Sequence, residues 1–440
     1  MKAFVSTIAS VFLATSALAE DVKRTLFTNV HVWDGTSETR LENAQVLVEG
    51  RLITKVAADP IPAEDARVID GQGSTLMPGL IDMHTHVMFK YGVNPSRPDV
   101  DHAAAGAMAL ETLQLYQRMG YTTLRDVGGN SLGLARVIAR GWVDAPRLYS
   151  SGTQISGISG HADLGTLNEA PGTDVFAKRG DGWGIVGDDA VRAAVLTNLR
   201  GGATHIKVMP GGGVASDFDP LESTSMTEGE LRAAVETADD YLTYVCAHAY
   251  NDKSINRFLD AGGRCIEHGF LIEEDTIKRM KELGAVMSLQ AYAAYEVFSD
   301  PDNIPGFSAE NARKGRQVHE GADRMMRWIK EYKIDAFGGS DLWPVDQLAV
   351  VPQDLVVRQR WFDDVEILRQ NTSHAARWLA KSGPKNPYKD GPLGVIEQGA
   401  YADLIIVRGD PTQDVSILVD YDANIPLIMR DGVIKKNTLD

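Results

Sequence analysis

The sequence predicts an α/β fold in which a (β/α)8 TIM barrel is joined to a small β-sandwich domain built from both chain ends. Apolar strands alternate with amphipathic helices through the middle of the chain, which is the pattern of parallel βαβ units. Short alternating strands broken by Gly and Asp occupy both ends instead. The predicted boundaries are a signal peptide at 1–19, the small domain at 20–75 and 385–440, and the barrel at 76–384.

The composition is that of an ordinary globular protein and excludes disorder and collagen-like repeats. The chain has 440 residues, of which 44% are apolar and 24% are charged. This length exceeds what one simple core supports, which favours a large domain with a smaller one. The formal net charge of −16 gives no basic field for phosphates and argues against a nucleic-acid or anionic-membrane binder.

The first nineteen residues have the three parts of a Sec signal peptide. Lys2 is followed by an apolar run and then by an Ala-Leu-Ala cleavage site that ends at Ala19. A buried N-terminal helix is the alternative, but it would not require this order of parts. No later stretch reaches the ~18 uninterrupted apolar residues that a membrane span needs. We therefore expect an exported, soluble protein, secreted or periplasmic, with Cys246 and Cys265 as buried free thiols rather than a disulfide.

The two ends carry the strands of the small domain. Residues 25–75 contain short β segments separated by Gly and Asp, and segments 402–410 and 425–432 near the other end repeat this pattern with Asp-Gly and Gly-Asp turns. Because the region between them has a different pattern, we expect the barrel to be inserted between two halves of one β domain.

The middle region contains eight strand-like segments, at 76–86, 121–128, 147–152, 204–210, 243–249, 264–269, 285–290 and 334–341. Helical segments separate most of them, and one begins with a capping box from Thr227 to Glu230. Gly201, Gly202 and Gly284 stand where helices should end. Eight strand–helix units close naturally into a barrel. The alternative, an open doubly wound sheet, lacks its GxGxxG fingerprint after the first strand.

Histidines and an aspartate follow several of these strands. His84 and His86 are two residues apart, so they share one face of the first strand and can bind the same metal ion. His248, His268 and Asp341 lie at the ends of the fifth, sixth and eighth strands. The carboxyl ends of barrel strands converge on one mouth, so we expect these side chains to form a metal site there.

Lys207 lies at the end of the fourth strand and belongs to the same predicted site. A charged lysine in a barrel mouth costs desolvation free energy unless its charge is removed or paired. One explanation is carboxylation by CO2, which gives an anionic oxygen ligand able to bridge two divalent ions. The alternative is a structural ion pair with an acidic residue such as Glu267.

Together these motifs resemble the amidohydrolase superfamily. The likeness runs from GLIDMHTH through IKVM, AHAY, EHG and GSD to the closing ADLIIV strand. Within the superfamily the chain is similar to the branch of imidazolonepropionase-like enzymes, binuclear Xaa-Pro and Xaa-Lys/Arg dipeptidases and ochratoxin-degrading amidohydrolases. Lys207 favours the binuclear peptidases over imidazolonepropionase itself, which uses one metal ion and no carbamate.

The resemblance implies two divalent metal ions, with zinc preferred over manganese or cobalt. By analogy, the first ion is held by His84, His86 and Asp341, the second by His248 and His268, and carboxylated Lys207 bridges them.

Metal-assisted hydrolysis then assigns Asp341 as general base and acid, since it would lie beside the attacking hydroxide. By resemblance, His161 and Tyr250 hold the carbonyl oxygen or the substrate carboxylate. Each could instead be an ordinary loop residue. The family often has His-Gly after the fifth-strand His, whereas this chain has Tyr250-Asn251, which indicates a different branch.

We expect a hydrolase that releases the C-terminal amino acid from dipeptides or N-acyl amino acids, with ochratoxin-like amides as further substrates. The alternatives are a cyclic amide or amidine hydrolase or deaminase, and a non-catalytic barrel-fold binding protein. A homo-oligomer is compatible with the sequence. We interpret segment 211–213 as a mobile glycine loop. The basic residues Arg313, Lys314 and Arg316 are expected to form a solvated helix face.

Overall fold

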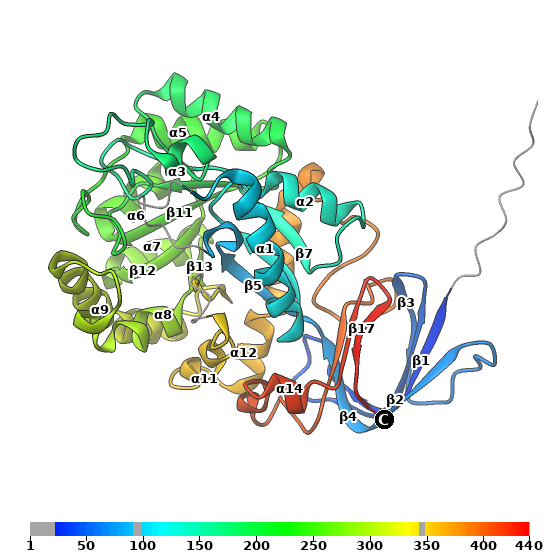
Figure 1. Cartoon of the computed structure of the whole chain (residues 1–440). Helices are drawn as coiled ribbons and strands as arrows, with labels where there is room; N and C mark the ends of the chain where they lie inside the picture. Colours follow the sequence, from blue (N-terminus) through cyan, green and yellow to red (C-terminus); the bar gives the residue numbers. More distant parts are fainter. Residues whose placement is uncertain (1–22, 91–98, 343–347, 440) are drawn as a thin grey trace, which may run out of the picture.

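The computed structural model describes residues 23–90, 99–342 and 348–439, so the predicted signal peptide lies outside the described residues. Two strand-rich regions are evident (Figure 1). A small domain at the lower right combines blue N-terminal strands with orange and red C-terminal strands, and the larger barrel lies beside it. The two ends of the chain therefore come together in one domain, and the barrel is inserted between them.

The small domain contains one seven-stranded sheet with the order β17-β16-β15-β4-β1-β2-β3. Strand β4 pairs with β1 on one side and with β15 on the other, which joins the two halves of the domain. Phe27, Val46 and Leu404 belong to the apolar core of this sheet, which is separate from that of the barrel. Its strands are β1 (Arg24–Val32), β2 (Leu41–Glu49), β3 (Leu52–Ala57), β4 (Arg67–Pro78), β15 (Leu404–Val407), β16 (Leu427–Arg430) and β17 (Val433–Asn437).

All eight predicted barrel strands are present and paired in parallel. They are β5 (Leu80–Thr85), β6 (Tyr121–Asp126), β7 (Arg147–Ser150), β10 (Ile206–Met209), β11 (Val245–Asn251), β12 (Cys265–Leu271), β13 (Val286–Leu289) and β14 (Ala336–Gly338). Thr204 N donates to Ser150 O at 2.9 Å and links β7 to β10. Asp341 N donates to His84 O at 2.9 Å, which joins the end of β14 to β5. The predicted barrel is therefore confirmed. Two short strands that the sequence did not reveal, β8 (Gln154–Ser156) and β9 (Gly182–Gly184), extend the sheet beside β10.

Helices surround the barrel, and several begin and end where the sequence indicated (Figure 1). The capping box of Thr227 and Glu230 starts α5, and left-handed Gly202 and Gly284 end α4 and α7. The longer helices are α1 (His102–Arg118), α2 (Leu132–Ala139), α4 (Asp188–Gly201), α5 (Glu228–Asp239), α6 (Asp252–Asp260), α7 (Glu274–Leu283) and α9 (Ala309–Glu331). The shorter ones are α3 (Val175–Arg179), α8 (Ala291–Tyr295), α11 (Gln353–Arg358), α12 (Asp364–Gln370), α13 (Ser373–Leu379) and α14 (Tyr421–Asn424).

The small domain is fixed to the barrel through Arg147 at the start of β7. Its guanidinium bonds Asp403 at 2.6 Å and Asp431 at 2.8 Å, and it lies over the rings of Tyr388 and Tyr401 at 4.7 and 4.0 Å. A guanidinium forms such bidentate and stacked contacts because it is planar. The contact anchors the amino-terminal side of the strands, so the site described below is built at the opposite, carboxyl end.

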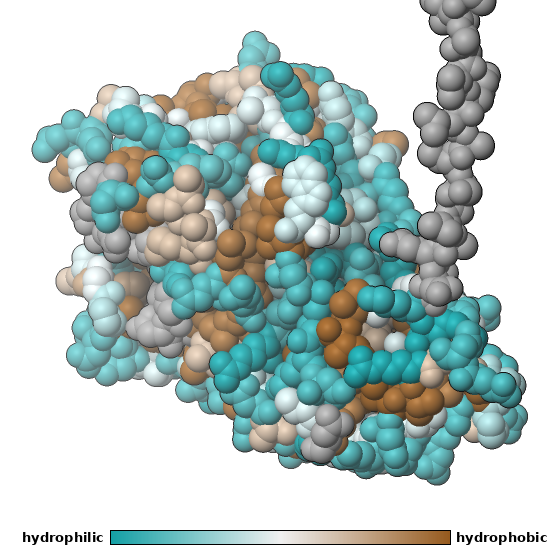
Figure 2. All heavy atoms as spheres, turned by 45° about the vertical axis from the view of Figure 1, so that its right-hand side comes forward, coloured by the Kyte–Doolittle hydropathy of each residue, from teal (hydrophilic) through white to brown (hydrophobic). Residues whose placement is uncertain are grey.

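Hydrophilic residues cover most of the face seen in Figure 2, with separate hydrophobic patches on the barrel and on the small domain. Among the described helices, none is both long and apolar enough to cross a membrane. Cys246 and Cys265 are buried and unpaired, as the sequence predicted.

Candidate active site

His84, His86 and Asp341 come together at the carboxyl ends of β5 and β14. Each offers a ligand atom, and these atoms lie within 4.8 Å of one another. The Oδ1 atom of Asp341 is 3.2 Å from Nε2 of His86 and 3.4 Å from Nε2 of His84. Two imidazoles and a carboxylate at such separations can hold one divalent cation.

The second predicted pair, His248 and His268, lies immediately beside this group. The two rings are 4.5 Å apart between centroids, and the His268 ring is 4.9 Å from that of His84. Nδ1 of His268 is 3.8 Å from Oδ2 of Asp341 and makes no hydrogen bond with any described residue. Asp341 therefore lies within 3.8 Å of His84, His86 and His268, and His248 joins the group through His268.

Lys207 lies on β10 and is fully buried, close enough to His84, His248 and His268 for its charge to lower their pKa values. Its Nζ atom has no hydrogen-bond partner among the described residues. The alternative partner, Glu267, instead contacts Nη2 of Arg125 at 2.6 Å and Nδ1 of His84 at 2.7 Å. A buried ammonium without an acceptor is costly. Carboxylation would remove that charge and would supply oxygen ligands, so the side chains present fit a pair of divalent ions.

Two of the predicted ligands occupy an unusual backbone conformation. His268 has a φ of 78° and Asp341 a φ of 54°, in the left-handed region that residues other than glycine seldom adopt. Non-glycine residues in this region concentrate at functional sites, where the surrounding structure holds them. Both side chains are turned in this way toward the same space.

The environment favours neutral His84, His248 and His268 and an ionised Asp341. Burial lowers the pKa of His84 to about 4, and burial also lowers the pKa values of His248 and His268. Burial alone would raise the pKa of Asp341, but His84, His86 and His268 outweigh it and hold that pKa below its ordinary value. Neutral imidazoles and a carboxylate are the forms that bind metal ions.

A second layer of buried polar groups orients His84. Glu267 accepts from His84 Nδ1, which leaves Nε2 directed at Asp341. Arg125 donates to both Glu267 and the carbonyl of Met83. Burial would raise the pKa of Glu267, but Arg125 and His84 hold it well below its ordinary value. The sequence suggested Glu267 only as a partner of Lys207, and its pairing with Arg125 is visible only in the fold.

His161 and Tyr250 lie at the edge of the histidine cluster. The His161 ring stacks on His248 at 4.1 Å, and its Nδ1 atom is 2.6 Å from Oγ of Ser216. The Tyr250 ring lies 4.7 Å from His248 and 5.2 Å from His268. Burial raises the pKa of Tyr250 well above its ordinary value, so the phenol keeps its proton and can donate it in a hydrogen bond. Both donors are therefore adjacent to the predicted metal ligands.

Two side chains of the cluster are partly exposed to solvent. The side chains of Asp341 and His161 are 23% and 16% exposed, whereas those of His84 and His268 are almost fully buried.

The prediction that Arg313, Lys314 and Arg316 form a solvated helix face is wrong for Lys314. Arg313 and Arg316 are exposed on α9, but Lys314 is only 1% exposed, and its Nζ atom binds carbonyl groups of the loop after β10. Glycines 211–213 of that loop are also buried. A Cβ atom on Gly213 would lie 2.0 Å from the His161 ring, so the loop approaches the site closely.

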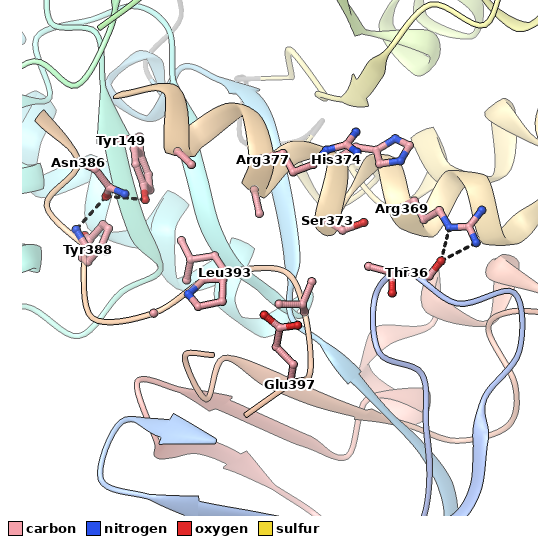
Figure 3. Close-up of a pocket in the computed structure, with 15 residues that line it drawn as sticks. Thr36, Tyr149, Arg369, Ser373, His374, Arg377, Asn386, Tyr388, Leu393 and Glu397 are labelled. Atoms are coloured by element: carbon pink, nitrogen blue, oxygen red, sulfur yellow. Dashed lines mark hydrogen bonds between the residues drawn. The ribbon is translucent and has the colours of Figure 1, made fainter. Parts of the chain in front are cut away.

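A separate cavity of about 520 Å³ lies between α13, β7 and the chain near Leu393 (Figure 3). Tyr149 and Tyr388 bind the Asn386 side chain on one side, and Arg369 binds Thr36 on the other. None of the predicted metal ligands lines it. The cavity is therefore distinct from the histidine cluster.

Comparisons with known proteins identify the family of this chain. A model described as "Amidohydrolase family" matches residues 75–322. A prolidase in complex with N-methylphosphonate-L-proline is similar with a TM-score of 0.88 and 30% identity, over 94% of this chain and 100% of that chain. A Xaa-Pro dipeptidase with methionine in its active site is similar with a TM-score of 0.83 and 25% identity, over 94% and 100% of the two chains. The ochratoxinase of Aspergillus niger is 27% identical over 392 residues, which cover 86% of this chain and 80% of the relative.

Proposed function

Because this chain belongs to the amidohydrolase family and is therefore a hydrolase of amide bonds, we propose that it uses two divalent metal ions, zinc by preference, to release the C-terminal amino acid from dipeptides or N-acyl amino acids. The observation that carries the proposal is the convergence of four histidines and Asp341 around a buried Lys207 whose Nζ atom has no hydrogen-bond partner among the described residues.

In this proposal all six side chains act as ligands. His84, His86 and Asp341 would hold one ion, His248 and His268 would hold the other, and carboxylated Lys207 would supply oxygen ligands to both. When bound, the cations supply Lewis acidity to the scissile carbonyl and to the attacking water. The lowered pKa values of His84, His248 and His268 support this assignment, because a protonated imidazole cannot bind a metal ion.

Asp341 moves the proton. It is held ionised by the histidines around it, so one carboxylate oxygen can accept a proton from the attacking water. Its side chain is 23% exposed, so a departing amine can reach it, and the same oxygen then returns the proton to that amine. Asp341 alone thus accepts the proton that water releases and donates it to the departing amine.

His161 and Tyr250 handle the substrate. Nδ1 of His161 is engaged by Ser216, so the other ring nitrogen is the one that can form a hydrogen bond with the substrate. Tyr250 keeps its phenolic proton and offers a second donor. Donors at this position would stabilise negative charge on the carbonyl oxygen or bind a free carboxylate.

The preference for a free amino-acid end rests on the relatives. One prolidase holds N-methylphosphonate-L-proline and one Xaa-Pro dipeptidase holds methionine, so both bind an amino acid or a derivative of one. The similarity to ochratoxinase adds ochratoxin-like amides to the compounds to be tested.

A hydrolysis panel tests the proposal. Zinc-loaded mature protein is incubated with dipeptides and N-acyl amino acids, and with the same compounds amidated at the C-terminus, and products are identified by mass spectrometry. We expect cleavage of the free acids only. Cleavage of neither set by protein with two bound ions would overturn the proposal in favour of cyclic amide hydrolysis or deamination.

We also propose that residues 1–19 direct export and are removed after Ala19. Edman sequencing of the protein recovered from outside the cytoplasm should begin at Glu20. A chain recovered only inside the cell with Met1 intact would contradict export.

A further inference from the structure

The segment 213–219, which follows β10, is tied to α9 by one buried lysine. Lys314 donates from Nζ to the carbonyl oxygens of Gly213 at 3.0 Å, Ser216 at 2.8 Å and Asp219 at 2.9 Å. An ammonium has three N–H donors, and here all three are used by the same segment. Lys314 therefore fixes three points of a short loop that has no regular secondary structure of its own.

Asp219 is the charge partner of this lysine. Its side chain is fully buried, and Oδ1 lies 3.7 Å from Nζ of Lys314. The other oxygen, Oδ2, accepts from the backbone N–H of Gly213 at 2.7 Å and lies 3.4 Å from Nδ1 of His161. The same carboxylate thus links the lysine to the histidine at the site.

The segment contacts His161 on more than one side. Oγ of Ser216 lies 2.6 Å from Nδ1 of His161, and Gly213 approaches the ring so closely that a methyl group there would collide with it. The ring in turn stacks on His248. A shift of the segment would therefore shift the His161 ring relative to the histidine cluster.

Asn311 lies one turn before Lys314 on α9 and adds a fourth attachment. Its Nδ2 atom donates to the carbonyl of Val214 at 2.6 Å. Nearby residues on the same helix, Arg313 and Arg316, point to solvent and pair with exposed Glu310 and Asp302 instead. The contacts with the segment are thus restricted to the buried face of α9.

We infer that Lys314 is a positioning residue: it holds segment 213–219 so that Ser216 and Asp219 keep the His161 ring in place for the substrate. The inference rests on the proposed function for the role of His161, and it goes beyond that function by assigning a remote residue on α9 to the reaction. Lys314 contacts neither the predicted metal ligands nor the space between them in any described interaction.

A double-mutant cycle with His161 separates positioning from simple stabilisation. kcat/KM is measured for the wild type, Lys314→Met, His161→Ala and the double variant, each checked for metal content. Because a small misplacement of a substrate-handling group is costly, we expect Lys314→Met to lower kcat/KM by about 30-fold. In the His161→Ala background the same change should cost less than about threefold. Equal losses in both backgrounds would show that Lys314 does not act through His161.

Arg313→Met is the matched control, since it removes a cationic side chain from the exposed face of the same helix turn. It should leave kcat/KM unchanged. If Lys314→Met does not fold, Lys314→Gln enters the same cycle, because its amide keeps a donor in the buried site but is too short to reach all three carbonyls.

Amide hydrogen exchange tests the inference without any substrate. Peptides that cover 213–219 should exchange faster in Lys314→Met than in wild type or Arg313→Met, while peptides from β11 and β12 are unchanged. Unchanged exchange across the segment would overturn the inference. If the wild type cleaves no compound of the panel, the proposed function fails, and the exchange experiment still decides whether Lys314 holds the segment.

Discussion

Oε2 of Glu267 lies 2.7 Å from Nδ1 of His84, and both side chains are fully buried. This contact places the proton of His84 on Nδ1 and leaves Nε2 as the ligand atom that faces Asp341. Arg125 supplies the counter-charge for Glu267. The orientation of a predicted metal ligand thus depends on a salt bridge inside the barrel that no substrate touches.

Glu267→Gln should weaken metal binding by about 10- to 100-fold, because the amide no longer holds His84 in one tautomer. The variant should also lose about 3 kcal/mol of unfolding free energy, since buried Arg125 is left without its partner. Chelator competition measures the first effect and urea unfolding the second. Glu273→Gln, at an exposed carboxylate paired with Arg324, should change neither. Wild-type metal affinity in Glu267→Gln would contradict the orienting role.

Lys207→Ala tests the carbamate directly. Elemental analysis should find about two ions per chain in the wild type and one or fewer in the variant, because the bridging ligand is gone. Acetate or propionate should restore part of the second ion and part of the hydrolytic rate by placing a carboxylate in the vacated space. Lys253→Ala, at an exposed position on α6, is the control. Full activity of Lys207→Ala with one bound ion would rule out the bridge.

The barrel could be predicted from sequence because each of its signals is local. Strands such as Ile206–Met209 and Val245–Asn251 are short apolar runs, and each contains one chemistry-bearing residue, Lys207 or His248. Once eight such segments are recognised, the topology brings their ends together. No side-chain geometry was needed to anticipate that His84 and Asp341 would meet.

What the sequence did not predict depends on contacts between distant segments. Lys314 looks like one more cation in a helix with Arg313 and Arg316, and only the fold shows that it faces the loop carrying Asp219. Glu267 likewise pairs with Arg125 and not with Lys207, and this contact joins two strands that are far apart in the sequence. Hydrophobic periodicity assigns a face to a helix, but it does not identify the carbonyl groups that the face will meet.

Asp341→Asn should abolish turnover while leaving the fold largely intact. The amide cannot accept a proton from water, and general acid–base catalysis contributes about 100- to 10,000-fold to such reactions, so a loss in that range is expected in kcat. Steady-state kinetics on the cleaved substrate and a thermal unfolding curve provide the measurement. Asp335→Asn serves as the control, because Asp335 is half-exposed and its described ion-pair partners, Arg377 and His374, lie outside the histidine cluster. A variant at position 341 with the full rate would remove Asp341 from the mechanism.

The metal-free protein should lose stability as the pH falls from 6.5 to 4. Burial lowers the pKa of His84 from 6.5 to about 4, so in this window the unfolded chain binds a proton that the folded chain excludes. Stability therefore rises with pH across the window, and the contribution of His84 is about 3 kcal/mol. Urea unfolding at several pH values measures the slope. His84→Asn should reduce the slope but not remove it, because burial also lowers the pKa values of His248 and His268. His102→Asn, at an exposed histidine that begins α1, is the control. The same slope in wild type and His84→Asn would show that His84 is not held neutral in the folded protein.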